Sequence, residues 1–248
     1  LPDADIRALA PAADGGVWVG TRRAGLLHVD RDLRVRAYGT AAGLPNLAVA
    51  ALAVEPGGAV WAGTFDGLCR LGAGADRFDC LGAADGLPTS YIRILLRGHD
   101  GTLWVGTREG LARVVAGKVE SLVRLGGAAA EPIGALAEDA RQGRLWIGPL
   151  SEAPLGMLRD GRLASRPDLS SGTPTEALWV DTAGSLWVGT GGGGLTRATG
   201  EAAETLTTAA GADLSTVLAL FQDREGSLWI GTGGGGLARL RTSRFTPI

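Results

Sequence analysis

The chain has 248 residues, of which 45% are hydrophobic and 41 are glycine, and its 24 basic and 26 acidic groups give a formal net charge of -2. The hydrophobic fraction and the small net charge exclude a wholly disordered chain. The chain has no excess of basic residues, so we expect no nucleic-acid partner. The longest apolar run, Leu47 to Val54, is far shorter than the ~20 residues that span a bilayer, so we expect no membrane insertion by this segment.

Six tryptophans recur along the chain at intervals of 41 to 43 residues. They are Trp18, Trp61, Trp104, Trp146, Trp187 and Trp229. Each lies in a variant of one phrase, read in chain order as VWVGT, VWAGT, LWVGT, LWIGP, LWVGT and LWIGT. A repeat of this length is one supersecondary unit that must bury its apolar face against its neighbours. Only the seventh tryptophan, Trp179, lies outside the period.

Each unit contains four short runs rich in Val, Ile, Leu and Thr, separated by Gly, Asp and Pro. In the third unit they read IRILL, LWVGT, GLARV and KVESL. Runs of this length between turn residues indicate strands, so the predicted fold is all-β, a β-propeller of six four-stranded blades. The blades are expected in a single domain, over about residues 1–42, 43–85, 86–127, 128–168, 169–210 and 211–248. We interpret them either as a ring closed by side-chain packing or as a piece of a longer array.

The second strand of each blade is predicted to be covered on both faces by neighbouring blades, because it reads as a continuous apolar run. Trp104 and Gly106 of one such run point to the same face, since side chains alternate along a strand. The indole is therefore expected to lie over bare glycine backbone. We interpret the six periodic tryptophans as core residues; an aromatic platform for sugars is the alternative.

The repeated unit combines GLP, I-R-x-L, D-G-x-L-W-V-G-T and G-G-L-x-R-L, most clearly over Gly86–Val114 and Leu214–Leu240. It resembles the two-component-regulator propeller repeat. The fourth unit departs from the pattern, with Pro149 in place of threonine and a longer turn. Proteins of that family are periplasmic sensor regions of bacterial receptors, in which propellers precede a membrane helix and a cytoplasmic histidine kinase or diguanylate cyclase.

The resemblance implies a periplasmic, non-catalytic propeller that senses a ligand or binds a partner. Ligands in the family are often glycans or their breakdown products, so a small-molecule or oligosaccharide ligand that is glycan-like or anionic is expected. Further expected partners are a downstream signalling domain of the same polypeptide and a second copy of the full receptor. These implications rest on fold analogy and not on a site.

No catalytic residue, metal site or cofactor is predicted. The two histidines, His28 and His99, are 71 residues apart at different places in the repeat, so a shared metal site or catalytic pair is not expected. The GTGGGGL stretches from Gly189 and Gly231 lack the lysine of a phosphate-binding loop and are interpreted as tight turns with positive φ. The alternatives are a propeller lyase or hydrolase acting on a polysaccharide or cyclic peptide, and a purely structural scaffold.

The two cysteines are predicted to lie opposite each other in a hairpin of the second blade. A turn around Gly74 pairs Leu71 with Phe78 and Cys69 with Cys80. Opposed residues are close enough for a bridge when the pair is of the non-hydrogen-bonded type. A disulfide would suit an oxidising periplasm, and two free buried thiols are the alternative.

Variation within the repeat indicates where a ligand could bind. The position eleven residues before each tryptophan, expected near the start of the innermost strand beside a central channel, holds Arg7, Ala50, Arg93, Gly134 (with an allowance for the longer turn), Glu176 and Leu218. Turns between second and third strands open on the same face. The predicted ligand-binding residues are Arg7, Arg22, Phe65, Tyr91, Arg93, Arg108 and Glu176. Arginines beside aromatic rings can hold anionic or sugar ligands by forked hydrogen bonds and stacking, and solvated loops are the alternative.

Overall fold

The computed structural model describes residues 1–3, 5–123, 131–169, 172–200, 202–209 and 211–241. These residues form two compact units, Leu1–Ile133 and Gly134–Ile248. Among the described residues no helix has the length and apolar character needed to cross a membrane. The expectation of a single domain stays a prediction, and each unit is a compact body in itself.

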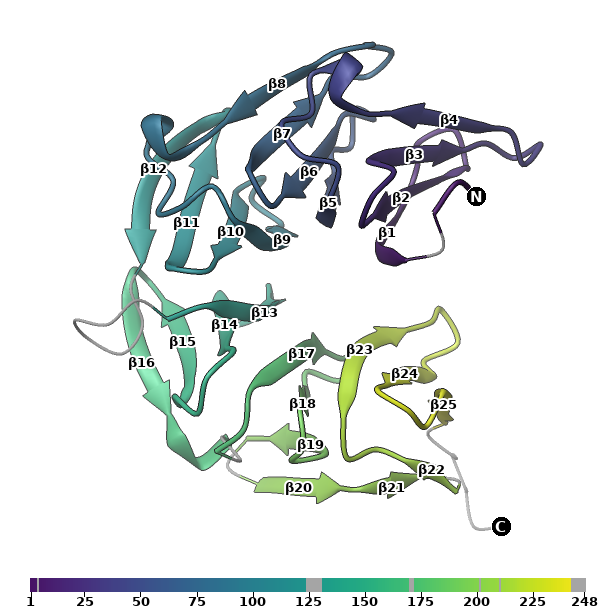
Figure 1. The fold of residues 1–248 in the computed structure, drawn as a ribbon. Helices are drawn as coiled ribbons and strands as arrows, with labels where there is room; N and C mark the ends of the chain where they lie inside the picture. Colours follow the sequence, from purple (N-terminus) through teal and green to yellow (C-terminus); the bar gives the residue numbers. More distant parts are fainter. Residues whose placement is uncertain (4, 124–130, 170–171, 201, 210, 242–248) are drawn as a thin grey trace. The chain divides into compact units, whose positions relative to one another are not determined.

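Unit 1 contains three antiparallel sheets of four strands, each paired in chain order (Figure 1). Blade 1 consists of β1 (Ile6–Pro11), β2 (Val17–Thr21), β3 (Leu26–Val29) and β4 (Val35–Tyr38). Blade 2 consists of β5 (Val49–Val54), β6 (Val60–Thr64), β7 (Gly67–Leu71) and β8 (Phe78–Leu81). Blade 3 consists of β9 (Ile92–Arg97), β10 (Leu103–Thr107), β11 (Gly110–Val115) and β12 (Lys118–Val123). The first strands pack side by side, β1 on β5 and β5 on β9.

Unit 2 repeats this architecture. Blade 4 consists of β13 (Ile133–Asp139), β14 (Arg144–Pro149), β15 (Leu155–Arg159) and β16 (Arg162–Arg166). Blade 5 consists of β17 (Thr175–Val180), β18 (Leu186–Thr190), β19 (Leu195–Thr199) and β20 (Ala202–Leu206). Blade 6 is described through β23 (Val217–Gln222), β24 (Leu228–Thr232) and β25 (Leu237–Leu240). Its predicted fourth strand, RFTPI, lies outside the described residues. The all-β class with six propeller blades is confirmed.

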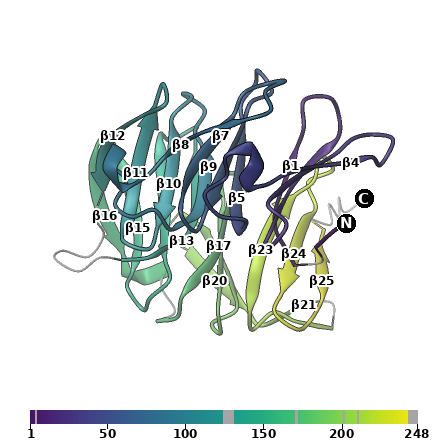
Figure 2. The same cartoon turned by 45° about the horizontal axis from the view of Figure 1, so that its top comes forward.

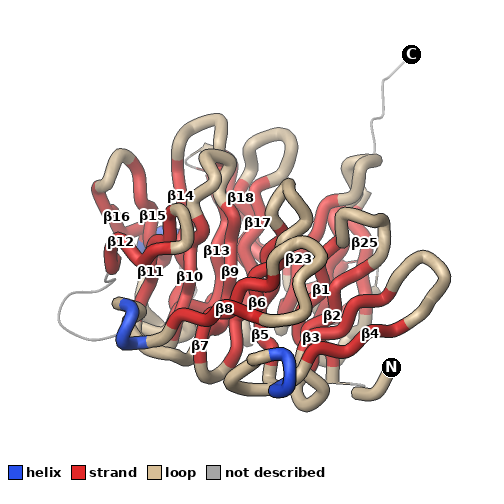
Figure 3. The backbone as a smooth tube through the Cα atoms, turned by 90° about the horizontal axis from the view of Figure 1, so that it is seen from above, coloured by secondary structure: helices blue, strands red, loops and turns tan. Residues whose placement is uncertain are grey.

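Three short 3-10 helices and one extra ladder interrupt the repeat. The helices are η1 (Thr40–Ala42), η2 (Ala83–Asp85) and η3 (Pro167–Leu169), and the ladder pairs β21 (Thr208–Ala209) with β22 (Ala212–Asp213). In unit 1 the helices lie where one blade passes to the next, at the same end of the sheets (Figure 3). We call this end the rim end, because it also carries the turns between second and third strands. The opposite end, which carries the turns before each second strand, is called the tryptophan end (Figure 2).

The second strands are buried as predicted, β6 and β18 at every position. The expected overlap of indole and glycine is wrong, because a branched side chain from the next blade fills the space over the glycine. A Cβ added to Gly63 would lie 2.6 Å from Ile92 Cγ2, and one added to Gly189 would lie 2.6 Å from Val217 Cγ1. Glycine is therefore needed at this position because the first strand of the following blade packs directly on it.

The periodic tryptophans are mostly core residues. Four are at most 9% exposed, namely Trp18, Trp61, Trp146 and Trp187. The other two, Trp104 and Trp229, are half-buried. Packing of the indole, rather than an open sugar platform, is thus the main role of the repeated residue.

The threonine that ends the phrase closes the following turn. Thr64 Oγ1 donates a hydrogen bond to the carbonyl of Gly67 over 2.9 Å, and Thr107 Oγ1 donates one to the carbonyl of Gly110 over 2.9 Å. The turn interpretation of the GTGGGGL stretches is confirmed, since Gly192 and Gly234 have φ values of 125° and 146°. A fixed turn at the rim end lets the residues within it vary.

Candidate functional site

The variable position of the repeat is a β-bulge in the first strand. The pairing of β9 with β10 passes from Ile92 to Ile94 across one residue, which leaves Arg93 as the extra residue. The same shift occurs at Arg7 in β1 and at Glu176 in β17. A bulged residue is not held by the ladder and can be directed away from the sheet, which is why bulges are frequent at functional sites. The sequence located this position, and the structure supplies its physical basis.

Three predicted residues of unit 1 come together at the rim end. The rings of Phe65, from the β6–β7 turn, and Tyr91, which precedes β9, stack with centroids 4.2 Å apart and planes 18° apart. The guanidinium of Arg108, from the β10–β11 turn, lies over the Tyr91 ring, 5.1 Å from its centroid. This arrangement, which we call the rim cluster, offers stacking and one exposed cation to a ligand.

Two further predicted arginines share a carboxylate in blade 1. Arg7 Nε lies 2.9 Å from Asp5 Oδ1, and Arg22 Nε lies 3.9 Å from Asp5 Oδ2. The Arg22 backbone N–H also donates to the Asp5 carbonyl over 3.0 Å. Asp5 was missed by the sequence analysis, although an acidic residue two positions before a candidate arginine is a signal that could have found it. Since these charges are already paired, this part of the rim is less free to bind an anion than Arg108.

The remaining two predicted residues occupy the bulge positions of β9 and β17. Arg93 is half-buried on β9, and its Nε is buried with no hydrogen-bond partner among the described residues. Glu176 lies on β17 of unit 2. The structure thus brings together Phe65, Tyr91 and Arg108, and no described contact adds Arg93 or Glu176 to them.

The cysteines of blade 2 have the predicted register, with Leu71 opposite Phe78 and Cys69 opposite Cys80. In the structure their Sγ atoms form a disulfide, with Cα atoms 4.0 Å apart. The bridge joins β7 to β8 within one blade, so it closes a local hairpin and leaves the rim cluster outside the loop.

The histidines lie in different blades, as their spacing indicated. His28 is on β3, where its ring packs against Trp18 with centroids 4.6 Å apart and its Nε2 lies 3.2 Å from Asp14 Oδ2. Hydrogen bonds from the Gly16 backbone and then from His28 lower the pKa of the Asp14 carboxyl. His99 is in the β9–β10 turn. Within the described part of the chain no group of His, Cys, Asp and Glu is arranged to hold a metal ion.

The tryptophan end carries a second polar arrangement that the sequence analysis missed. The indole N–H of Trp61 donates to Glu55 Oε1 over 2.7 Å, and Arg70 holds the same carboxylate with two hydrogen bonds, from Nε at 2.9 Å and from Nη2 at 2.7 Å. The Arg70 hydrogen bonds, followed by that of Trp61, hold the pKa of Glu55 below its usual value against the effect of burial. The same tryptophan–carboxylate hydrogen bond joins Trp187 to Asp181 and Trp229 to Asp223, so a carboxylate six residues before the tryptophan is its sequence signal.

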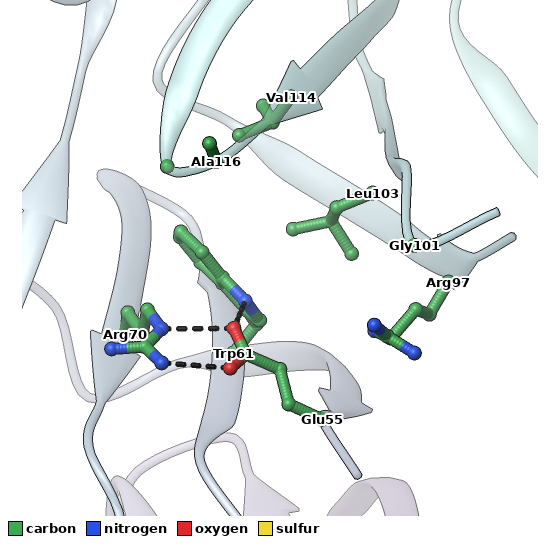
Figure 4. A pocket seen from close by; sticks show the side chains of 9 residues that line it. Glu55, Trp61, Arg70, Arg97, Gly101, Leu103, Val114 and Ala116 are labelled. Carbon is green, nitrogen blue, oxygen red and sulfur yellow. Dashed lines mark hydrogen bonds and ion pairs between the residues drawn. The ribbon is translucent and has the colours of Figure 1, made fainter. Parts of the chain in front are cut away.

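A cavity of about 400 Å³ lies beside this arrangement, between blades 2 and 3 (Figure 4). Its lining is formed by Glu55, Trp61, Arg70, Arg97, Gly101, Leu103, Val114, Ala116 and Gly117. Figure 4 shows Arg97 across the open space from Trp61, with its guanidinium directed toward Glu55. The cavity therefore combines two cations, one anion and apolar walls at the end of the sheets opposite the rim cluster.

Three of the repeats are similar to a known protein family. The model of the two component regulator propeller family matches residues 1–23, 86–109 and 212–234, which fall in the first, third and sixth repeats. These three repeats are two-component-regulator propeller repeats. The resemblance drawn from the sequence motifs is confirmed. Comparison with curated proteins gives no significant match.

Solved structures share the propeller fold at low sequence identity. The extracellular domain of the one-component system BT4673 from B. thetaiotaomicron is 18% identical, with a TM-score of 0.72 over 96% of this chain. Virginiamycin B lyase from Staphylococcus aureus is 15% identical, with a TM-score of 0.78 over 97% of this chain and 82% of that chain. PorZ, a surface component of the type-IX secretion system of Porphyromonas gingivalis, is 19% identical, with a TM-score of 0.71 over 95% of this chain. This chain spans only 38% of the length of the BT4673 and PorZ chains.

Proposed function

We propose that this chain is a non-catalytic sensing propeller, part of the extracytoplasmic input region of a transmembrane signalling receptor. The observation that carries the proposal is the match of three repeats to the two component regulator propeller family. The likeness in fold to the extracellular domain of BT4673 supports it. The Cys69–Cys80 bridge supports a periplasmic location, because disulfides persist in oxidising compartments. In this role a downstream signalling domain of the same polypeptide and a second receptor copy are the partners.

The rim cluster is the proposed ligand site. The Phe65–Tyr91 stack presents a flat apolar surface, and Arg108 places a cation beside it. Flat aromatic surfaces bind the apolar faces of sugar rings, and a guanidinium binds a carboxylate or sulfate through two parallel hydrogen bonds. A glycan-like or anionic small ligand, such as an acidic oligosaccharide, fits this combination.

Thermal shift and calorimetric titration with tri-galacturonate and maltotriose test the ligand site. A ligand at one hundred times its Kd stabilises the folded chain by about 2.7 kcal/mol, so a specific ligand raises the unfolding temperature. We expect Arg108→Gln to weaken binding of tri-galacturonate by roughly tenfold or more, as loss of a charge-assisted hydrogen bond does. Arg34→Gln is the matched control, because Arg34 is a surface arginine with its side chain 81% exposed.

Equal affinity of the Arg108→Gln and Arg34→Gln variants for tri-galacturonate would show that the rim cluster is not the ligand site. No shift with any of the oligosaccharides would favour a structural scaffold instead.

A lyase or hydrolase is the second candidate, favoured by the likeness in fold to virginiamycin B lyase. Turnover assays on polysaccharides and cyclic peptides decide between the two functions. Turnover that is abolished by Arg93→Gln or Glu176→Gln would replace the sensing function, because both residues occupy the bulge position at the first strand.

A further inference from the structure

The last residue of the first strand differs from blade to blade at the tryptophan end. The register places it opposite the first residue of the second strand. The residues in this position are Pro11, Val54, Arg97, Val180 and Gln222 in blades 1, 2, 3, 5 and 6. In blade 4 the first strand ends in Asp139, whose carboxylate is paired with Arg144 over 2.8 Å. Arg97 is the one cation among these described residues. Apolar residues form the same strand pair in blades 1, 2 and 5, so strand pairing does not require a cation at this position.

Gln222 shows what a polar side chain does there when it serves the fold. Its Oε1 accepts a hydrogen bond from the Thr182 backbone N–H of the preceding blade over 2.9 Å, and its Nε2 donates to the Gly226 carbonyl over 3.2 Å. Gln222 therefore ties two blades together. In Figure 4 no hydrogen bond or ion pair joins the guanidinium of Arg97 to the other residues that line the cavity. Its donors face the open space.

Glu55 supplies one further polar contact in the same space. Its two oxygens accept three hydrogen bonds, one from Trp61 and two from Arg70. A carboxylate has about four lone-pair sites, so one acceptor site remains, and it suits a hydroxyl donor. Among the residues that line the cavity, Arg70 compensates this negative charge, so Arg97 gives the lining an excess of one positive charge.

The size and walls of the cavity set the size of an occupant. Its volume of about 400 Å³ falls in the range of small-molecule sites, roughly 300 to 1,000 Å³. The matched gap between blades 4 and 5 has a volume of about 110 Å³; there the guanidiniums of Arg144 and Arg166 lie over Trp146, and Leu169 is buried. The matched gap between blades 5 and 6 has a volume of about 950 Å³ and holds the neutral Gln222 in place of Arg97. In the cavity between blades 2 and 3, Leu103 and Val114 form an apolar wall facing Trp61 (Figure 4).

We propose that this cavity is a second ligand site, which binds a small hydroxycarboxylate with its carboxylate on Arg97 and a hydroxyl on Glu55. The carbon chain of the ligand packs between Trp61 and the wall of Leu103 and Val114. The site uses different residues and the opposite end of the blades from the rim cluster, so it does not depend on the proposed function.

Three six-carbon probes test the two polar contacts separately: D-gluconate, D-sorbitol, which lacks the carboxylate, and hexanoate, which lacks the hydroxyls. Calorimetric titration of the full chain is expected to show gluconate binding at least ~10-fold more tightly than either other probe, since each loses one charge-assisted hydrogen bond. Arg97→Gln is expected to weaken gluconate binding by ~10-fold or more. Arg34→Gln, a change of the same kind on an exposed arginine, is expected to leave it unchanged.

Circular-dichroism melting of Arg97→Gln checks that the variant is folded, and Arg97→Lys, which keeps the charge, is expected to bind gluconate with intermediate affinity. The proposal is overturned by the absence of gluconate binding at millimolar concentration, or by equal affinity of the wild type and Arg97→Gln. Equal affinity for gluconate and hexanoate overturns the assignment of the hydroxyl to Glu55. Gluconate binding that is weakened by Arg108→Gln and not by Arg97→Gln would place gluconate at the rim cluster and overturn this proposal, so failure of either site can be recognised by itself.

Discussion

Blades 1 and 2 share the phrase of the second strand but surround its tryptophan differently. In blade 2 the indole N–H of Trp61 donates to Glu55, and Arg70 holds that carboxylate. In blade 1 the residue six positions before the tryptophan is Ala12, and the buried Nε1 of Trp18 has no hydrogen-bond partner among the described residues. The Trp18 ring packs instead against His28. The repeat thus fixes the apolar packing, whereas the polar groups around the indole vary and can acquire other roles.

Blades 1 and 2 also differ in the disulfide, since blade 1 has Leu27 and Ala37 in the register position of Cys69 and Cys80. Removing the disulfide is expected to have the largest effect on the free energy of unfolding. We expect the double variant Cys69→Ala, Cys80→Ala to lose ~3 kcal/mol of unfolding free energy, since a short loop in the unfolded chain is released. Urea unfolding with and without dithiothreitol measures this. The reductant should lower the midpoint of the wild type and leave that of the variant unchanged; an unaffected wild type would show that blade 2 needs no bridge.

Replacing tryptophan by phenylalanine in each blade tests the hydrogen bond directly. Both Trp61→Phe and Trp18→Phe remove part of a buried ring, but only Trp61→Phe also removes the N–H that donates to Glu55. Hydrogen bonds to charged groups contribute about 1.5–3 kcal/mol, so we expect Trp61→Phe to cost ~1–2 kcal/mol more than Trp18→Phe at this partly exposed carboxylate. Urea unfolding gives both values. Equal losses of unfolding free energy in the two variants would mean that the Trp61–Glu55 hydrogen bond adds no stability.

Acid should affect blade 2 through Glu55, and this is the smallest of the three effects. The pKa of the folded carboxyl lies below the usual 4.5, chiefly because of the Arg70 hydrogen bonds. The stabilisation is therefore complete above about pH 4.5 and is lost as the pH falls through the lowered folded pKa. Relative to Glu55→Gln, the wild type should lose unfolding free energy as the pH falls below about 4.5.

Asp32→Asn on the surface, with Asp32 73% exposed, is the control for this acid response. Parallel pH profiles for the wild type and Glu55→Gln would contradict the role of the carboxylate.

The strands, the turns and the cysteine register could be predicted because they depend on local patterns. The turn around Gly74 fixes the register of the hairpin and is enough to place Cys69 opposite Cys80. The residue over Gly63 could not be predicted, because it comes from Ile92 in the next blade and depends on how two sheets pack. Arg97 was missed for a similar reason: it reads as one residue of an apolar strand, and its meaning appears only when the register aligns it with Val54 and Gln222.

The bulge described in the first strands of blades 1, 2, 3, 5 and 6 has a consequence for the evolution of such a protein. A residue left out of the ladder can be replaced without disturbing the bonds on either side of it. Arg7, Ala50 and Arg93 occupy this position in the three blades of unit 1. Substitutions at these three positions change the side chains offered to a ligand and leave the strand pairing intact. A small combinatorial library over the three positions is a direct route to altered ligand selectivity.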